Sequence, residues 1–150
     1  MKIFKIIAWL ALIALVVIQF FPVDDNYSKA VPSSDFLLVN KVPATIASTL
    51  QVSCYDCHSN DTDYPWYGKV QPFAWYLEDH IAHGKEELNF NEWDTYSDRR
   101  KSSKLRSMIS QIESGEMPME SYTLIHREAI MDSVATQSVV NYLEELKSNY

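Results

Sequence analysis

The chain has 150 residues and a formal net charge of −7 at pH 7. An acidic protein lacks the basic face that nucleic acids require, so the charge argues against nucleic acid as a partner. The chain holds only three glycines and shows no strongly alternating stretch, which predicts an all-α fold rather than a sheet.

The N-terminal residues 1–23 are predicted to form a transmembrane helix. Lys2 and Lys5 precede an apolar run over residues 6–21, and neighbouring apolar residues extend it to about 20, the length that spans a bilayer. The run ends in bulky residues, which favours an uncleaved anchor over a cleaved signal sequence. Lysines before the run and acidic residues after it predict that the rest of the chain lies on the periplasmic side of a bacterial cytoplasmic membrane.

Residues 24–40 are polar and include Pro32, which predicts a tether. Residues 41–150 are predicted to form one domain, large enough to bury a single core. Apolar residues recur at helical spacing in four stretches of it, and Gly115 is placed to end the third. The four predicted helices cover residues 43–54, 72–87 and 97–114, and a last stretch from Asp132 or Ser133 to about Lys147.

The run Cys54-Tyr55-Asp56-Cys57-His58 is a Cys-x-x-Cys-His motif, the attachment signature of c-type haem. Two thiols three positions apart can each add to one haem vinyl group, and the adjacent histidine can ligate the iron as proximal ligand. The chain has no other cysteine. The motif therefore predicts one haem c per chain. In bacteria this attachment takes place outside the cytoplasmic membrane, the compartment that the N-terminal charges also predict.

Two other interpretations of the motif stay open at this point. A redox-active Cys-x-x-Cys is one, although no βαβ pattern surrounds the motif. A structural zinc site is the other, and it would need two further ligands from His80, His83 and His126. His80 and His83 are three residues apart on a predicted helix, so a Cys2His2 site is conceivable.

A methionine just after the third predicted helix is the best candidate for the second iron ligand. Met117 precedes Pro118, and the proline biases Met117 toward extended backbone, which takes the segment out of the helix. A thioether on such a loop can be held over the open face of a haem. Met119 is a competitor two residues away, and His80 or an open distal site are further alternatives.

Further short motifs surround this pattern: Ser59-Asn60, Tyr64-Pro65-Trp66-Tyr67, Leu88-Asn89-Phe90 with Trp93, Glu116-Met117-Pro118, and Tyr122 with His126. Over roughly residues 40–147 the chain resembles the haem-binding domain family of membrane-anchored, single-haem, cytochrome-c-like proteins. The resemblance implies covalent haem at Cys54 and Cys57, with His58 as proximal and Met117 as distal ligand. Where the family has a leucine-like residue after the proline, this chain has Met119.

The fold expected from these observations is a small all-α, cytochrome-c-like domain around one covalent haem, preceded by the transmembrane helix. The expected function is a membrane-anchored carrier of single electrons rather than an enzyme, with a redox partner protein in or at the membrane. The alternative is a haem enzyme or a gas or redox sensor with an open distal site. Coordination by Met117 would distinguish them, because a sixth protein ligand favours electron transfer over catalysis.

Overall fold

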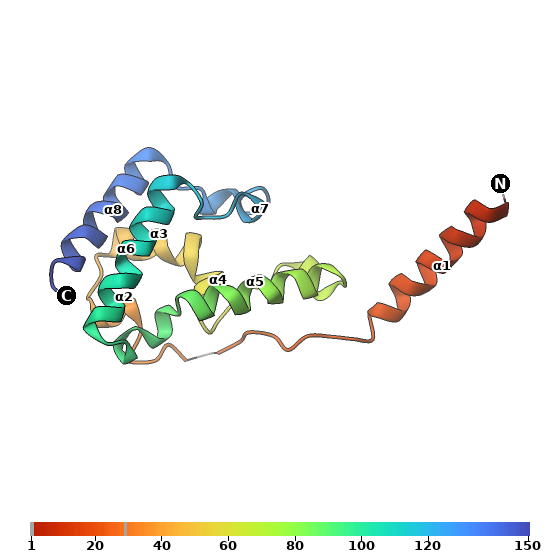
Figure 1. Cartoon of the computed structure of the whole chain (residues 1–150), viewed down its shortest axis with the longest axis horizontal. Coiled ribbons are helices and arrows are strands. Elements are labelled where there is room, and N and C mark those ends of the chain that lie inside the picture. Colours follow the sequence, from red (N-terminus) through yellow and green to blue (C-terminus); the bar gives the residue numbers. More distant parts are fainter. Residues whose placement is uncertain (1, 29) are drawn as a thin grey trace.

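In this computed structural model, which describes residues 2–28 and 30–150, α1 (Lys2–Ile18) stands apart from the other helices at the end of an extended segment (Figure 1). The described residues form helices, turns and irregular segments, and no strand occurs among them. The remaining α-helices are α2 (Phe36–Val39), α3 (Ala44–Leu50), α4 (Asp56–His58), α5 (Phe73–Glu87), α6 (Asp98–Ser114), α7 (Glu120–Thr123) and α8 (Ser133–Lys147). Short helical turns lie at Gln51–Tyr55, Trp66–Lys69, Phe90–Thr95 and Arg127–Ala129.

The helices predicted for the domain are present in the structure, and their capping residues explain where they begin and end. The Ser97 side chain accepts a hydrogen bond from the Arg100 N–H at the start of α6. Gly115 follows the last residue of α6 with φ of 74°, the left-handed conformation that glycine adopts most easily. Asp132 caps α8 by accepting from the Ala135 N–H at 2.8 Å.

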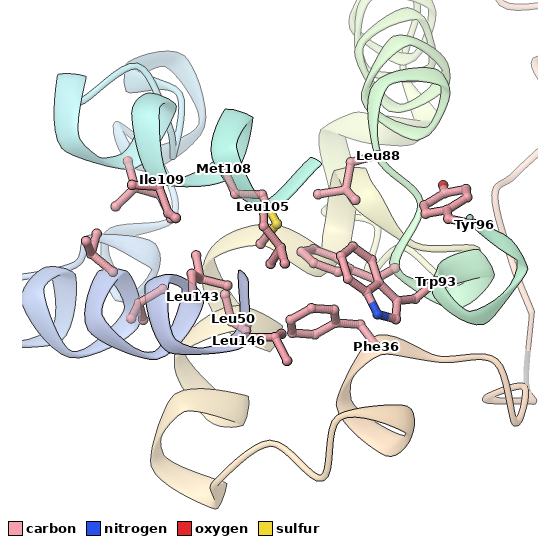
Figure 2. Packing of buried hydrophobic residues seen from close by; sticks show 14 residues of the cluster. Phe36, Leu50, Leu88, Trp93, Tyr96, Leu105, Met108, Ile109, Leu143 and Leu146 are labelled. Atoms are coloured by element: carbon pink, nitrogen blue, oxygen red, sulfur yellow. The ribbon is translucent and has the colours of Figure 1, made fainter. Parts of the chain in front are cut away.

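The hydrophobic core forms where α6 and α8 pack together and against the turn Phe90–Thr95 and α2 (Figure 2). Trp93 is completely buried, and its ring meets that of Phe36 edge-on with centroids 4.8 Å apart. This geometry is a favourable one for aromatic rings. Leu105 of α6 and Leu143 of α8 are also fully buried. The core therefore fixes α6 and the segment before it, both of which border the candidate site.

The prediction of an N-terminal transmembrane helix is wrong. Among residues 2–28 and 30–150, no helix combines the length and the apolar character needed to cross a membrane. The 17 residues of α1 rise about 26 Å, less than the hydrocarbon core of about 30 Å. The sequence argument counted residues up to 23 as helical.

After α1 ends at Ile18, polar groups of the chain bond to residues at the N-terminal end of α5. The Gln19 side chain accepts from the Gln71 N–H at 3.0 Å and donates to the Gln71 carbonyl at 3.1 Å. The Phe21 carbonyl accepts from the Gln71 side chain and from the Trp75 indole N–H at 3.0 Å. The Gln19, Phe20 and Phe21 N–H groups donate to carbonyls three residues back, so the chain leaves α1 through a tighter turn.

The segment 24–40, predicted as a tether, contributes directly to the core. Phe36 is completely buried, and Asp35 is only 1% exposed. The Asp35 carboxylate accepts hydrogen bonds from the Leu37 N–H at 2.9 Å, the Asn91 side-chain amide at 2.8 Å and the Tyr55 hydroxyl at 3.1 Å. Since Tyr55 lies between the two cysteines of the motif, this buried carboxylate links the start of the compact part to the candidate site.

Replacing Asp35 with alanine should lower the free energy of unfolding by about 2–4 kcal/mol, because three donors lose their buried acceptor. Tyr55→Phe removes only one of those donors and should cost about 1 kcal/mol. Guanidinium titrations of the haem-loaded proteins, followed by circular dichroism, measure both values. Equal and small effects of the two substitutions would show that the Asp35 bonds contribute little to stability.

Candidate functional site

A change of helical geometry determines where the side chains of the motif point. The α3 helix passes into a π-helical turn, Gln51–Tyr55, and then into the single turn of α4. A π-helical turn widens the helix and shifts the side chains that follow it. As a result Cys54, Cys57 and His58 all line one cavity of about 300 Å³.

A second cavity of about 240 Å³ adjoins the first. Both are lined mainly by apolar surface and share residues of the motif region, of α5 and of the loop after α6; we call the two together the cleft. The shared lining residues are Ser53, Cys54, His58, Glu87 and Met117. The first cavity extends along α5 toward His80 and His83, and the second extends along α6.

The His58 ring is held by two backbone carbonyls from the C-terminal end of α5. Its Nδ1 lies 2.8 Å from the Gly84 oxygen and 3.0 Å from the Leu88 oxygen. Since both neighbours are acceptors, Nδ1 carries the hydrogen and donates it. Burial lowers the pKa of His58, against the opposing effect of these two carbonyls. The ring is therefore a neutral imidazole whose Nε2 has no hydrogen-bond partner among the described residues, the form in which histidine ligates a metal.

The two cysteines are free thiols rather than a disulfide. Burial raises the pKa of Cys54 to about 12, with a smaller contribution from the nearby Cys57. Burial also raises the pKa of Cys57 to about 11, helped by the negative charge of Asp56. Both thiols are consequently neutral at physiological pH. Within residues 2–28 and 30–150 no group of three or more His, Cys, Asp and Glu side chains is arranged to hold a metal ion.

Met117 and Met119 both line the first cavity, but only Met117 also lines the second. The Met117 N–H donates to the Gln111 carbonyl at 3.1 Å, which ties the loop to the last turns of α6. The left-handed Gly115 turns the chain between them. Of these two methionines, Met117 is thus the one that lines both cavities of the cleft. The assignment of an iron ligand to it stays a prediction.

The alternative histidines occupy different positions. His80 lines the first cavity, with its Nδ1 at 2.8 Å from the Tyr76 carbonyl and its ring 4.1 Å from the Tyr76 ring. His126 does not line the cleft, and its Nε2 lies 3.0 Å from the Tyr67 hydroxyl. Of the two, only His80 is placed to compete with Met117.

A side-chain bond connects the motif to the chain that follows Met117. The Tyr122 hydroxyl of α7 donates to the Asp56 carboxylate at 2.6 Å, and Tyr122 itself lines the first cavity. The same tyrosine ring stacks on His126 with centroids 4.4 Å apart. This bond therefore holds the segment that follows Met117 against the Cys-x-x-Cys-His motif.

Gly84, Lys104 and Glu87 line the cleft but were not identified from the sequence. A glycine inside a predicted helix costs stability and so signals a packing reason, and Gly84 has one. A Cβ at Gly84 would lie 2.7 Å from the Cys57 carbonyl oxygen. Because Gly84 has no side chain, α5 can approach the motif closely, and the Gly84 carbonyl can accept a hydrogen bond from the His58 ring. The two charged residues had no comparable sequence signal.

Gly84→Ala should reduce haem binding severalfold, because the added methyl group collides with the motif backbone and displaces the carbonyl that orients His58. The matched control is Gly115→Ala, where a Cβ meets nothing within 4 Å and only the positive φ is strained, at a cost of about 1 kcal/mol. Haem content per folded protein, measured by absorbance, compares the two. Equal haem content in both variants would contradict the packing role of Gly84.

Comparison with known proteins gives one match. The family model described as "Haem-binding domain" matches residues 13–145, which include the motif, the whole cleft and the Met117 loop. No curated protein and no solved structure matches the chain. The comparisons therefore identify a family, and the particulars of the site rest on the geometry described above.

Proposed function

The chain belongs to the haem-binding domain family, and from this premise we propose that one haem is bound covalently in the cleft and serves as a carrier of single electrons. Cys54 and Cys57 would form thioether bonds to the haem, one to each vinyl group. Support comes from the donor set: two unbridged thiols, a neutral imidazole and a thioether border one mainly apolar cleft.

His58 and Met117 are the residues that would hold the iron. The Gly84 and Leu88 carbonyls fix the tautomer and orientation of the His58 ring and leave Nε2 for the iron. Met117 borders both cavities, so its sulfur is the donor best placed to complete the coordination. A haem held between these ligands supplies an iron that cycles between the ferrous and ferric states.

The role of the protein is to bind this group and to restrict access to it. The mainly apolar cleft limits water near the iron, which affects its reduction potential. The Tyr122–Asp56 bond holds the loop that carries Met117 against the motif. We propose an electron carrier rather than an enzyme because a sixth protein ligand leaves no open position for a substrate. The observation that carries this proposal is the position of Met117 on both cavities.

The proposal extends to location and partner. Covalent haem attachment implies that the domain works on the outer side of a bacterial cytoplasmic membrane, where haem c is assembled. The partner would be another redox protein, and the net charge of −7 favours one with a basic docking face, since complementary charge steers association.

Carbon monoxide binding by the reduced protein tests the functional part of the proposal. A protein with His58 and Met117 as ligands should titrate as a reversible one-electron couple, and its reduced spectrum should not change under carbon monoxide. Rapid formation of a carbon monoxide complex would instead indicate an open distal site and a haem enzyme or sensor.

A further inference from the structure

One edge of the cleft carries polar side chains from a single face of α6. Lys104, Ser107 and Gln111 all line the second cavity, and their spacing of three and four residues places them side by side along the helix. The Ser107 and Gln111 side chains make no hydrogen bond to any of the described residues. Two neutral donors and one cation therefore face a cavity that is otherwise mainly apolar.

Lys104 is the only Lys or Arg that lines either cavity, as judged over residues 2–28 and 30–150. Its side chain is 18% exposed, so most of the length of the side chain is buried. Its ion-pair partner, Glu87, is 87% exposed, and the Lys104 Nζ lies 3.9 Å from the Glu87 Oε2. That distance is too long for a direct hydrogen bond. The Lys104 ammonium thus has only a loose counter-ion.

We propose that Lys104, with Ser107 and Gln111, forms the subsite for the haem propionates. The inference rests on the proposed function, because it requires haem in this cleft. Propionates are anionic acceptors, and the edge formed by these three side chains offers one positive charge and uncharged donors. Lys104, Ser107 and Gln111 line the second cavity beside α6, which Cys54 also lines and Cys57 does not.

The charged and titratable groups around this subsite come from four elements besides α6: the turn Gln51–Tyr55, α4, α5 and α7. The second cavity contains Cys54, His58 and Glu87 besides Lys104, and the first adds Asp56, Cys57, Asp79, His80, His83 and Tyr122. The carboxylates among them would repel a propionate. Lys104 is the one group with a permanent positive charge at neutral pH, so it is the residue that offsets this repulsion.

When a haem propionate takes up a proton, the plot of midpoint potential against pH changes slope at the pKa of that propionate. We call this change of slope the bend, and Lys104→Gln should raise the pH at which it occurs. A nearby ammonium favours the ionised propionate, so its removal should move the bend upward by about one pH unit, a tenfold change in proton affinity. The experiment uses the full-length, haem-loaded protein and covers about pH 4 to pH 8, around the ordinary range of carboxyl groups. The haem content per chain, measured by absorbance, is recorded for each variant so that the bends are compared at equal loading.

Two variants make the result specific. Arg106→Gln removes the same charge from the same helix at an exposed position outside the cleft, and should leave the bend in place. Glu87→Gln removes the neighbouring carboxyl group and should not abolish the bend. Equal shifts in the Lys104 and Arg106 variants, no bend in the Lys104 variant, or loss of the bend in the Glu87 variant would each overturn the subsite. Failure to bind haem at all would instead overturn the proposed function.

Discussion

Replacing both Cys54 and Cys57 with serine is expected to remove all covalent haem and to leave little folded protein. Serine cannot form a thioether, so no haem should survive acid–acetone extraction or denaturing electrophoresis. The fold should suffer as well, because a tightly bound group stabilises the native state by mass action and the cleft borders the core at Leu88, Phe90 and Met108. Haem-stained gels and circular dichroism measure the two effects.

The single variants are the controls for this prediction. Cys54→Ser and Cys57→Ser each keep one thiol, and each should retain haem through a single thioether in reduced yield. Covalent haem at the normal level in the double variant would show that attachment does not use this motif. Loss of haem without loss of fold would show that the fold does not depend on the group.

Met117→Ala is expected to abolish the weak sulfur-to-iron band of the oxidised protein in the far red. It should also lower the reduction potential, by on the order of 0.1 V within the range of about 0.8 V that axial ligands span. The iron should then bind carbon monoxide when reduced and cyanide when oxidised, because the distal position becomes exchangeable. Absorption spectra and a redox titration of the purified variant provide all three readouts.

Met119→Ala is the matched control, since Met119 lines only one of the two cavities. It should keep the band and change the potential only modestly, as a packing change beside the ligand would. Loss of the band in this variant, with its retention in Met117→Ala, would assign the ligand to Met119. Retention of the native coordination in both variants would point to His80 and weaken the electron-carrier proposal.

Local sequence signals predicted the helices of the domain well because these signals act over short distances. Ser97, Gly115 and Asp132 sit at helix ends in the structure as their capping chemistry requires. The attachment motif was equally visible, because its chemistry lies within five consecutive residues. Its use in haem attachment remains a prediction.

Features that depend on contacts between distant segments could not be predicted. After Ile18 the chain continues in tighter turns, and the Gln19 side chain bonds to Gln71, 52 residues away, neither of which hydropathy alone reveals. The burial of Asp35 and Phe36 likewise depends on partners such as Asn91 and Trp93. Lys104 resembled an ordinary surface lysine, since its place beside the cleft follows only from how α6 packs.

The intact mass of the purified chain, produced together with a c-type haem maturation system and measured under denaturing conditions, tests the central claim most directly. Covalent attachment through Cys54 and Cys57 predicts a chain heavier by one haem, with no thiol left to alkylate. A chain at its unmodified mass with two alkylatable thiols, and haem found only as a separate species, would contradict the account.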